Sequence, residues 1–294
     1  MLLLLTLASL AGGCALPRSE AGLHQVITQE IGKPRVGIPQ YRCTIGAHRG
    51  SSVDFLENTL DAFKAADTND KYAFIEFDVQ YTKDRKMVVF HDRRLLRLFG
   101  SLRSVGSSTY AELVEATKGE VCLYTDAMAV LRKRLNIEIK SQGDDEEDRQ
   151  LADELISDLR QRRRTGSVMI SSISPDVLRY INETYPDIPT GKIYWLTRST
   201  YLHLDSLTEG LYGDFEKTQA DYLMLHVSNL RNIERLLALK PDGKTIMFWD
   251  FEDNMFLVHK DLSDRLWGTS AIKNWFQQMR YGLNKPPLSE ESGN

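Results

Sequence analysis

The sequence is short of several features that mark common classes of protein. No glycine-rich phosphate loop follows any apolar segment, so a nucleotide-binding fold is not indicated. The net charge is −4 over 294 residues, and this lack of a basic surplus argues against general nucleic-acid binding. The apolar run Met1–Leu10 is too short to cross a bilayer. Cysteines are few, and although Cys43 and Cys122 could pair in an exported protein, we expect two partly buried free thiols.

The first 14 residues are typical of a targeting segment. Their apolar run is followed by Ala11-Gly12-Gly13-Cys14, which resembles a bacterial lipoprotein cleavage site. We therefore predict an exported, membrane-anchored lipoprotein (periplasmic or cell-surface), attached to the membrane surface through lipid on Cys14. Plain secretion is the alternative, because no lysine or arginine precedes the apolar run. Residues 15–40 are expected to form a tether and an N-terminal arm, residues 41–283 the catalytic domain, and residues 284–294 a tail.

Short apolar segments alternate with amphipathic ones through residues 41–283. The predicted strands are 44–48, 73–79, 87–91, 135–140, 167–171, 192–196, 221–226, 245–249 and 271–274. Near-continuous apolar strands separated by helices are typical of a parallel sheet that helices cover. For a barrel of eight strands, one of these candidates is spurious or lies outside the barrel.

Helix signals accompany these strands. Asn58 is expected to cap a helix over 59–66, and Ser174 followed by proline a helix over 177–183. A third helix is predicted over 149–164, with one apolar face. We expect the acidic run Asp144–Asp148 before it to be a loop. The basic run Arg160–Arg164 is expected to be the solvated end of this helix rather than a binding patch.

Charged side chains recur at the C-terminal ends of the first four long predicted strands. They are His48, Glu76, Asp78, His91, Glu138 and Lys140. In a (β/α)8 barrel these ends converge on one mouth, where barrel active sites lie. In an open sheet they would be spread along a line in steps of about 5 Å. We therefore predict an α/β fold of the TIM-barrel type with its site at this mouth.

The spacing of the acidic residues indicates a metal site. Glu76 and Asp78 are two apart on one strand and share a face, as do Glu138 and Lys140. Three inward carboxylates repel one another, so we predict one divalent cation, Mg²⁺ or Ca²⁺, on Glu76, Asp78 and Glu138. Two other interpretations stay open: the acids are exposed on an edge strand, or the two histidines are also ligands.

These residues lie in five short motifs. The motifs are His48-Arg49-Gly50, Glu57-Asn58-Thr59, Glu76-Phe77-Asp78-Val79, Val88-Val89-Phe90-His91-Asp92 and Ile137-Glu138-Ile139-Lys140. In this order they resemble the glycerophosphodiester phosphodiesterase family, whose fold is a PLC-like phosphodiesterase barrel, over residues 42 to about 177. The resemblance implies metal-dependent hydrolysis of glycerophosphodiesters to an alcohol and glycerol 3-phosphate. It also implies that His48 and His91 are the acid/base pair, and that Arg49 and Lys140 contact the phosphate.

The C-terminal third departs from the family pattern and leaves the substrate open. Trp249 is retained but is followed by Asp250 where the family has threonine, and 270–274 resembles the final strand only remotely. Trp249 is therefore either a wall of the glycerol site or a core tryptophan. We expect a glycerophosphodiester or a lipid-derived phosphodiester as the partner. The alternatives are a phospholipase D-like enzyme or cyclising lyase, and a non-catalytic surface lipoprotein that binds a ligand.

Overall fold

The computed structural model of the chain describes residues 44–249 and 254–258, all within one compact unit, Tyr41–Trp267. Several predictions fall outside the described residues: the leader over 1–14, the arm over 15–40, Cys43, the strand over 271–274 and the tail over 284–294. Among the helices that the structure describes, we find none with the length and hydropathy of a bilayer span.

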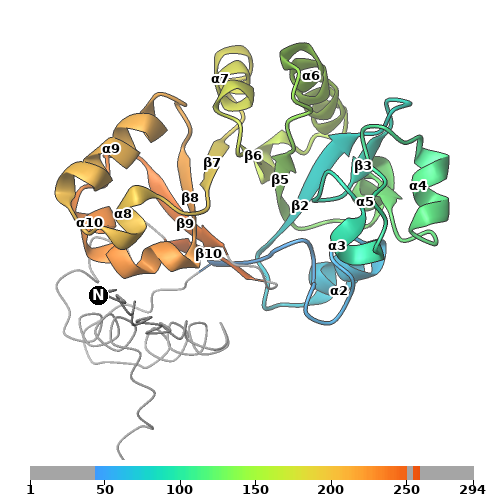
Figure 1. The fold of residues 1–294 in the computed structure, drawn as a ribbon, viewed down its shortest axis with the longest axis horizontal. Helices are drawn as coiled ribbons and strands as arrows, with labels where there is room; N and C mark the ends of the chain where they lie inside the picture. Colours follow the sequence, from blue (N-terminus) through green and yellow to red (C-terminus); the bar gives the residue numbers. More distant parts are fainter. Residues whose placement is uncertain (1–43, 250–253, 259–294) are drawn as a thin grey trace, which may run out of the picture. The chain divides into compact units, whose positions relative to one another are not determined.

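Strands of the described chain form one ten-stranded sheet (Figure 1). They are β1 (Thr44–Ala47), β2 (Phe74–Tyr81), β3 (Met87–Val89), β4 (Cys122–Leu123), β5 (Arg134–Ile139), β6 (Val168–Ser172), β7 (Thr190–Tyr194), β8 (Tyr222–His226), β9 (Thr245–Trp249) and β10 (Asn254–Val258). Their order is β1-β10-β9-β8-β7-β6-β5-β2-β3-β4, and β1 also pairs in parallel with β2. Strand β1 thus pairs with both ends of a series of seven strands, β10 to β2, which confirms the predicted α/β fold of the TIM-barrel type.

The direction of β10 differs from that of the strands beside it. It is antiparallel to both β1 and β9, whereas β2, β5, β6, β7, β8 and β9 pair in parallel. Only residues 250–253 separate Trp249 from Asn254. A parallel crossover needs a dozen residues or more, so this short connection allows only an antiparallel partner. Neither β10 nor the two-residue β4 was predicted.

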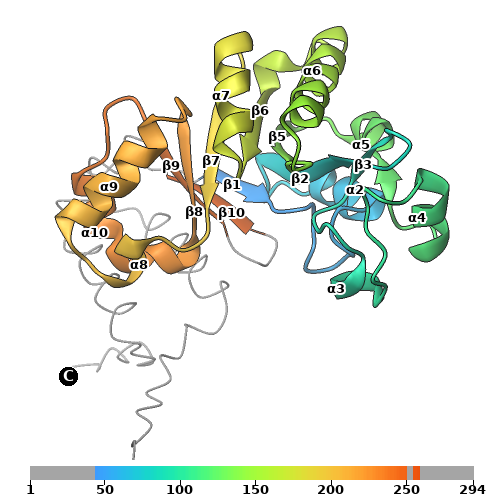
Figure 2. The same cartoon turned by 45° about the horizontal axis from the view of Figure 1, so that its top comes forward.

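Helices connect the strands. They are α2 (Leu60–Thr68), α3 (Leu96–Phe99), α4 (Tyr110–Ala116), α5 (Tyr124–Val130), α6 (Asp145–Gln161), α7 (Pro175–Thr184), α8 (Arg198–Tyr201), α9 (Asp205–Glu216) and α10 (Ile233–Ala238), with 3₁₀ turns η1 (Thr165–Ser167) and η2 (Val227–Asn232). Figures 1 and 2 show α6, α7 and α9 on the outer side of the strands.

The helix ends confirm one predicted cap and correct another. Ser174 caps α7 as expected, because its side chain accepts the N–H of Val177. The cap of α2 is Thr59 rather than Asn58, with the Thr59 hydroxyl accepting from Ala62. Asn58 is instead used by the site described below.

The acidic run is the start of α6 and not a loop. The side chain of Asp144 accepts the N–H groups of Glu146 and Glu147, and residues 145–148 form the first turn. Carboxylates satisfy the free N–H groups there and offset the positive end of the helix dipole. The basic run Arg160–Arg164 lies at the C-terminal end of α6 and is largely exposed, as predicted.

Two apolar layers flank the sheet. An outer layer between strands and helices includes Phe63, Ile75, Phe77, Ile137 and Leu155. A smaller inner cluster consists of Phe74, Ile193, Met224, Met247 and Trp249. Side chains alternate between the faces of a strand, so Glu76 and Asp78 share the inner face with Phe74. All eight residues of β2 are buried, which excludes the interpretation of Glu76 and Asp78 as exposed acids on an edge strand.

Candidate active site

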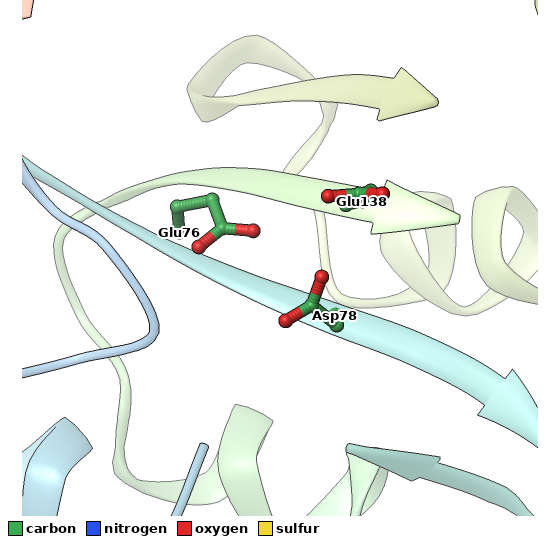
Figure 3. A group of neighbouring side chains, drawn as sticks. All are labelled: Glu76, Asp78 and Glu138. Atoms are coloured by element: carbon green, nitrogen blue, oxygen red, sulfur yellow. The ribbon is translucent and has the colours of Figure 1, made fainter. Parts of the chain in front are cut away.

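Three carboxylates meet on the inner face of β2 and β5. One oxygen from each of Glu76, Asp78 and Glu138 lies within 4.8 Å of the others, and all three residues are buried (Figure 3). Asp78 is the direct cross-strand partner of Glu138 in the parallel pairing of β2 with β5. The structure thus brings together the three residues that the sequence assigned to a metal.

The charge of this cluster is unbalanced. Burial, together with the charges of Asp78 and Glu138, raises the pKa of Glu76 well above its usual value. Burial likewise raises the pKa of Glu138. Burial alone would also raise the pKa of Asp78, but the positive charge of Lys140 and other cations nearby lower it. A buried, all-oxygen set in which two members resist ionisation fits a hard divalent cation, which would supply the missing positive charge.

Lys140 lies against the same carboxylates. Its Nζ is 2.5 Å from Oε1 of Glu138 and 2.9 Å from Oδ1 of Asp78. Burial lowers the pKa of Lys140, but these two carboxylates raise it by more, so the ammonium stays charged. The residue predicted to contact phosphate therefore lies at the cluster itself and offsets part of its negative charge.

Arg49 reaches the cluster from the turn after β1. The N–H of Arg49 donates to Oε2 of Glu76 at 2.9 Å, and its side chain donates to Oε1 of Glu57 at 2.8 Å. Arg49 and Gly50 have φ values of 62° and 80°, a left-handed conformation that is costly for arginine. A Cβ on Gly50 would lie 2.9 Å from the backbone of Ala62 in α2. This turn can pack so closely on α2 only with glycine.

The two predicted catalytic histidines have different surroundings. Nε2 of His48 lies 3.8 Å from Oε2 of Glu76, and its side chain is buried. His91 is 29% exposed, and its Nδ1 lies 2.6 Å from Oδ1 of Asp92. Burial raises the pKa of Asp92, but hydrogen bonds from His91 and Arg97 lower it to about 2. An ionised Asp92 can only accept, so Nδ1 of His91 carries a proton and Nε2 is the atom that can exchange one.

Trp249 packs in the core and also lies close to His48. It is 9% exposed and packs in the inner apolar cluster with Met224 and Met247. Its ring centroid is also 5.8 Å from that of His48 and 4.9 Å from that of His226. Trp249 is therefore a core tryptophan that borders a candidate catalytic histidine.

The site contains residues that sequence reasoning missed. Asn58 donates from Nδ2 to Oδ2 of Asp78 at 2.7 Å, and its Oδ1 accepts the N–H of Asp78 at 3.4 Å. Arg97 donates to both oxygens of Glu57 and to Asp92. Asn58 stands in a recognised motif, but its position before α2 suggested a cap. The role of Arg97 could not be predicted from the residues around it, because its partner Glu57 is 40 residues away in the sequence.

Sequence comparisons identify the relatives of this chain. The model of the glycerophosphoryl diester phosphodiesterase family matches residues 48–279. A lysophospholipase D from Homo sapiens is 30% identical over 187 residues, which cover 56% of this chain and 57% of the human protein. A glycerophosphodiester phosphodiesterase from Bacillus subtilis is 26% identical over 252 residues, 73% of this chain and 84% of the bacterial protein. The chain thus spans little more than half of the human relative.

Solved structures share the fold. A glycerophosphodiester phosphodiesterase from Thermotoga maritima aligns with a TM-score of 0.56 and 27% identity, over 72% of this chain and 88% of that one. A phosphodiesterase from Oleispira antarctica, solved with sn-glycerol-3-phosphate, aligns with a TM-score of 0.57 over 80% of this chain and 95% of that one. At 20% identity, this second likeness is evidence for the fold alone.

Proposed function

Because the chain belongs to the glycerophosphoryl diester phosphodiesterase family, we propose that it hydrolyses glycerophosphodiesters to an alcohol and glycerol 3-phosphate. One observation carries this proposal. The buried carboxylates Glu76, Asp78 and Glu138 converge on the inner face of β2 and β5, and His48 lies 3.8 Å from Glu76. His91 follows β3, which is antiparallel to β2 and is therefore not one of the parallel barrel strands, contrary to the prediction. Carboxylates for a cation and imidazoles for proton transfer are the groups that hydrolysis of a phosphodiester requires.

Each residue has a proposed role. Glu76, Asp78 and Glu138 hold one divalent cation, which when bound polarises a phosphoryl oxygen and offsets the charge of the transition state. Arg49 presents its guanidinium to the phosphate, oriented by its hydrogen bond to Glu57. Lys140 keeps a positive charge beside the carboxylates.

Proton transfer is assigned to the two histidines. His91 exchanges its proton at Nε2, because Asp92 fixes the proton on Nδ1. We propose His48 as the base and His91 as the acid. The partial exposure of His91 suits it to protonate a leaving alkoxide that departs into water.

Mg²⁺ or Ca²⁺ is the proposed metal, since both prefer oxygen ligands. The test is a metal-stripped protein assayed on glycerophosphocholine after addition of each cation, with phosphorus NMR of the products. We expect no turnover without metal and glycerol 3-phosphate with it. Full activity in excess chelator would refute the requirement for a divalent cation. A cyclic phosphate product would identify a lyase instead of a hydrolase.

A second candidate substrate is a lysophospholipid. The human relative is a lysophospholipase D, and its match to this chain supports the same cleavage here. The bond broken, between phosphorus and the head-group oxygen, is the same as in glycerophosphocholine, so one catalytic site serves both. Comparing lysophosphatidylcholine with glycerophosphocholine as substrates decides between them.

We also propose that the protein is exported and anchored through Cys14. The small residues Ala11-Gly12-Gly13 before this cysteine support the proposal. The intact mass of protein recovered from a bacterial membrane fraction tests it. We expect the leader to be absent and an acylated N-terminal cysteine to be present. In Cys14→Ala the leader should be retained and the acyl group absent.

A further inference from the structure

The exposed large apolar residues of the described chain are confined to the connections that follow strands. Val53 and Phe55 follow β1, Leu96 and Leu102 follow β3, and Ile173, Trp195, Leu196, Tyr201, Leu202 and Leu204 follow β6 and β7. No such side chain of the described residues lies in a connection that leads from a helix into the next barrel strand. In a barrel the connections after the parallel strands form the mouth, so the residues after β1, β6 and β7 lie on the side of the site. Strand β3 is antiparallel to β2, and this rule does not place Leu96 and Leu102 there.

Six of these residues form a group that we call the apolar rim: Ile173, Trp195, Leu196, Tyr201, Leu202 and Leu204. They are 46–60% exposed and follow two neighbouring strands, β6 and β7. Figure 2 shows the chain running from the end of β7 into α8, which contains Tyr201. Leu202 and Leu204 follow α8, and we call these two residues the outer part of the rim. Single exposed apolar side chains are ordinary, but six of them on the connections after two neighbouring strands are typical of a binding surface.

The outer part of the rim has inverted polarity. Ser199 and Thr200 in α8 are buried at 1% and 0% exposure, whereas Leu202 and Leu204 are 60% and 57% exposed. In an ordinary surface segment the hydroxyl groups would face water and the leucines would face the core. The reversed arrangement shows that the leucines are presented outward by the fold.

Hydrogen bonds fix this arrangement. The side chain of the buried Asn229, in η2 after β8, receives hydrogen bonds from the hydroxyls of Thr197 and Thr200. The same side chain donates to the carbonyl of Trp195 at 2.7 Å. Residues 195–200 are thus held to the η2 turn after the neighbouring strand, and the exposure of the side chains beside them does not come from fraying.

Aromatic rings connect the rim with the catalytic centre. The centroid of Trp195 lies 6.3 Å from that of His226, and His226 lies 4.9 Å from Trp249. Trp249 is in turn 5.8 Å from His48. A partner seated on the rim therefore lies next to the entrance of the site.

Resting on the proposed function, we propose that the apolar rim docks on a phospholipid surface, from which the enzyme takes its diester. Tryptophan, tyrosine and leucine are the side chains that insert into the boundary between head groups and acyl chains. A protein partner or a second copy seated on the rim would cover the mouth and block the substrate. A lipid surface instead delivers the substrate at that place.

The test compares one enzyme on two substrates with the same scissile bond. The full chain and its Leu202→Gln/Leu204→Gln variant are assayed on glycerophosphocholine in solution and on lysophosphatidylcholine in phosphatidylcholine vesicles. Both leucines are exposed and outside the catalytic centre, so turnover in solution should stay within about twofold. Turnover on vesicles should fall about tenfold or more, because the variant loses two leucine side chains that become buried in the membrane on docking.

The matched control is Leu102→Gln, which removes a leucine that is 68% exposed, follows β3 and lies outside the rim. It should leave both rates unchanged. Equal turnover on vesicles by the double variant and the parent would overturn docking, as would a dimer in solution that the double variant dissociates. Absence of any turnover by the parent would refute the proposed function alone. In that case co-sedimentation with the vesicles, weaker for the double variant and unchanged for Leu102→Gln, still decides docking.

Discussion

Arg97 forms a bidentate ion pair with Glu57, in which Nη2 lies 2.6 Å from Oε1 and Nη1 lies 2.8 Å from Oε2. The same guanidinium donates through Nε to Asp92 at 2.8 Å. Glu57 in turn accepts from Arg49, and Asp92 accepts from His91. Arg97 therefore links Glu57, which orients Arg49, with Asp92, which orients His91.

Replacing Arg97 with alanine should lower kcat about 10- to 100-fold while leaving the fold intact, because supporting residues of a site typically have effects of this size. Its side chain is 45% exposed, so the loss in free energy of unfolding should be about 1 kcal/mol or less. Arg97→Lys keeps the charge but not the planar fork and should be intermediate. Arg94→Ala, an exposed neighbour, is the control. Equal activity of the two alanine variants would contradict the orienting role.

Glu76→Gln should stabilise the metal-free protein and abolish its response to metal. Burial and two neighbouring carboxylates disfavour the ionised form, so an uncharged isostere removes repulsion from the empty cluster. Thermal unfolding with chelator should show a higher Tm than the parent, and added divalent cation should raise the Tm of the parent alone. The exposed Glu183→Gln serves as control. A variant that still gains stability from metal would remove Glu76 from the ligand set.

Alanine at His48 or His91 should each lower kcat about 10²- to 10⁴-fold, the usual contribution of general acid/base catalysis. The parent should show a bell-shaped pH profile, of which each variant loses one limb. Asp92→Asn should lower kcat less than either alanine variant, because it changes the tautomer of His91 but keeps the imidazole. His203→Ala, in the connection between α8 and α9, should leave turnover of glycerophosphocholine unchanged. Rates within tenfold of the parent for both variants at His48 and His91 would refute their assignment.

The free energy of unfolding should fall as the pH is lowered from about 6.5 towards 4, in part through His226. Burial lowers its pKa to about 4, and Nδ1 accepts the N–H of Ser228, which requires the unprotonated ring. Within this window the unfolded chain binds a proton that the folded chain does not, so stability rises with pH. At 1.36 kcal/mol per unit the effect is at most about 3 kcal/mol. His226→Gln should flatten the slope measured by urea titration, and an unchanged slope would contradict the lowered pKa.

The arrangement of the carboxylates could be predicted from the sequence because it depends on local rules. Residues two apart on a strand share a face, and the ends of neighbouring parallel strands lie side by side. Glu76 and Asp78 satisfy the first rule, and Asp78 beside Glu138 satisfies the second. Neither rule needs a knowledge of side-chain contacts between distant segments.

The supporting residues could not be predicted, because their roles arise from contacts distant in sequence. Asn58 faces Asp78 only once the turn after β1 folds back over β2. Strand β10 was not predicted because its segment carries no recognised motif, and the strand predicted over 271–274 lies outside the described residues. In the acidic run that begins α6, the run of charges suggested a loop, although Asp144 is a favourable N-cap residue for a helix.

The in-register pairing of Asp78 with Glu138 has a consequence for the order of assembly. All three carboxylates come from β2 and β5, which are adjacent and share six residue pairs, so two strands suffice to create the cluster. A cation could bind before the other strands of the barrel have formed, and it would then hold β2 and β5 together as a folding nucleus. Refolding in the presence of the cation should then accelerate the earliest phase, whereas substitutions in β7, β8 or β9 would act only later.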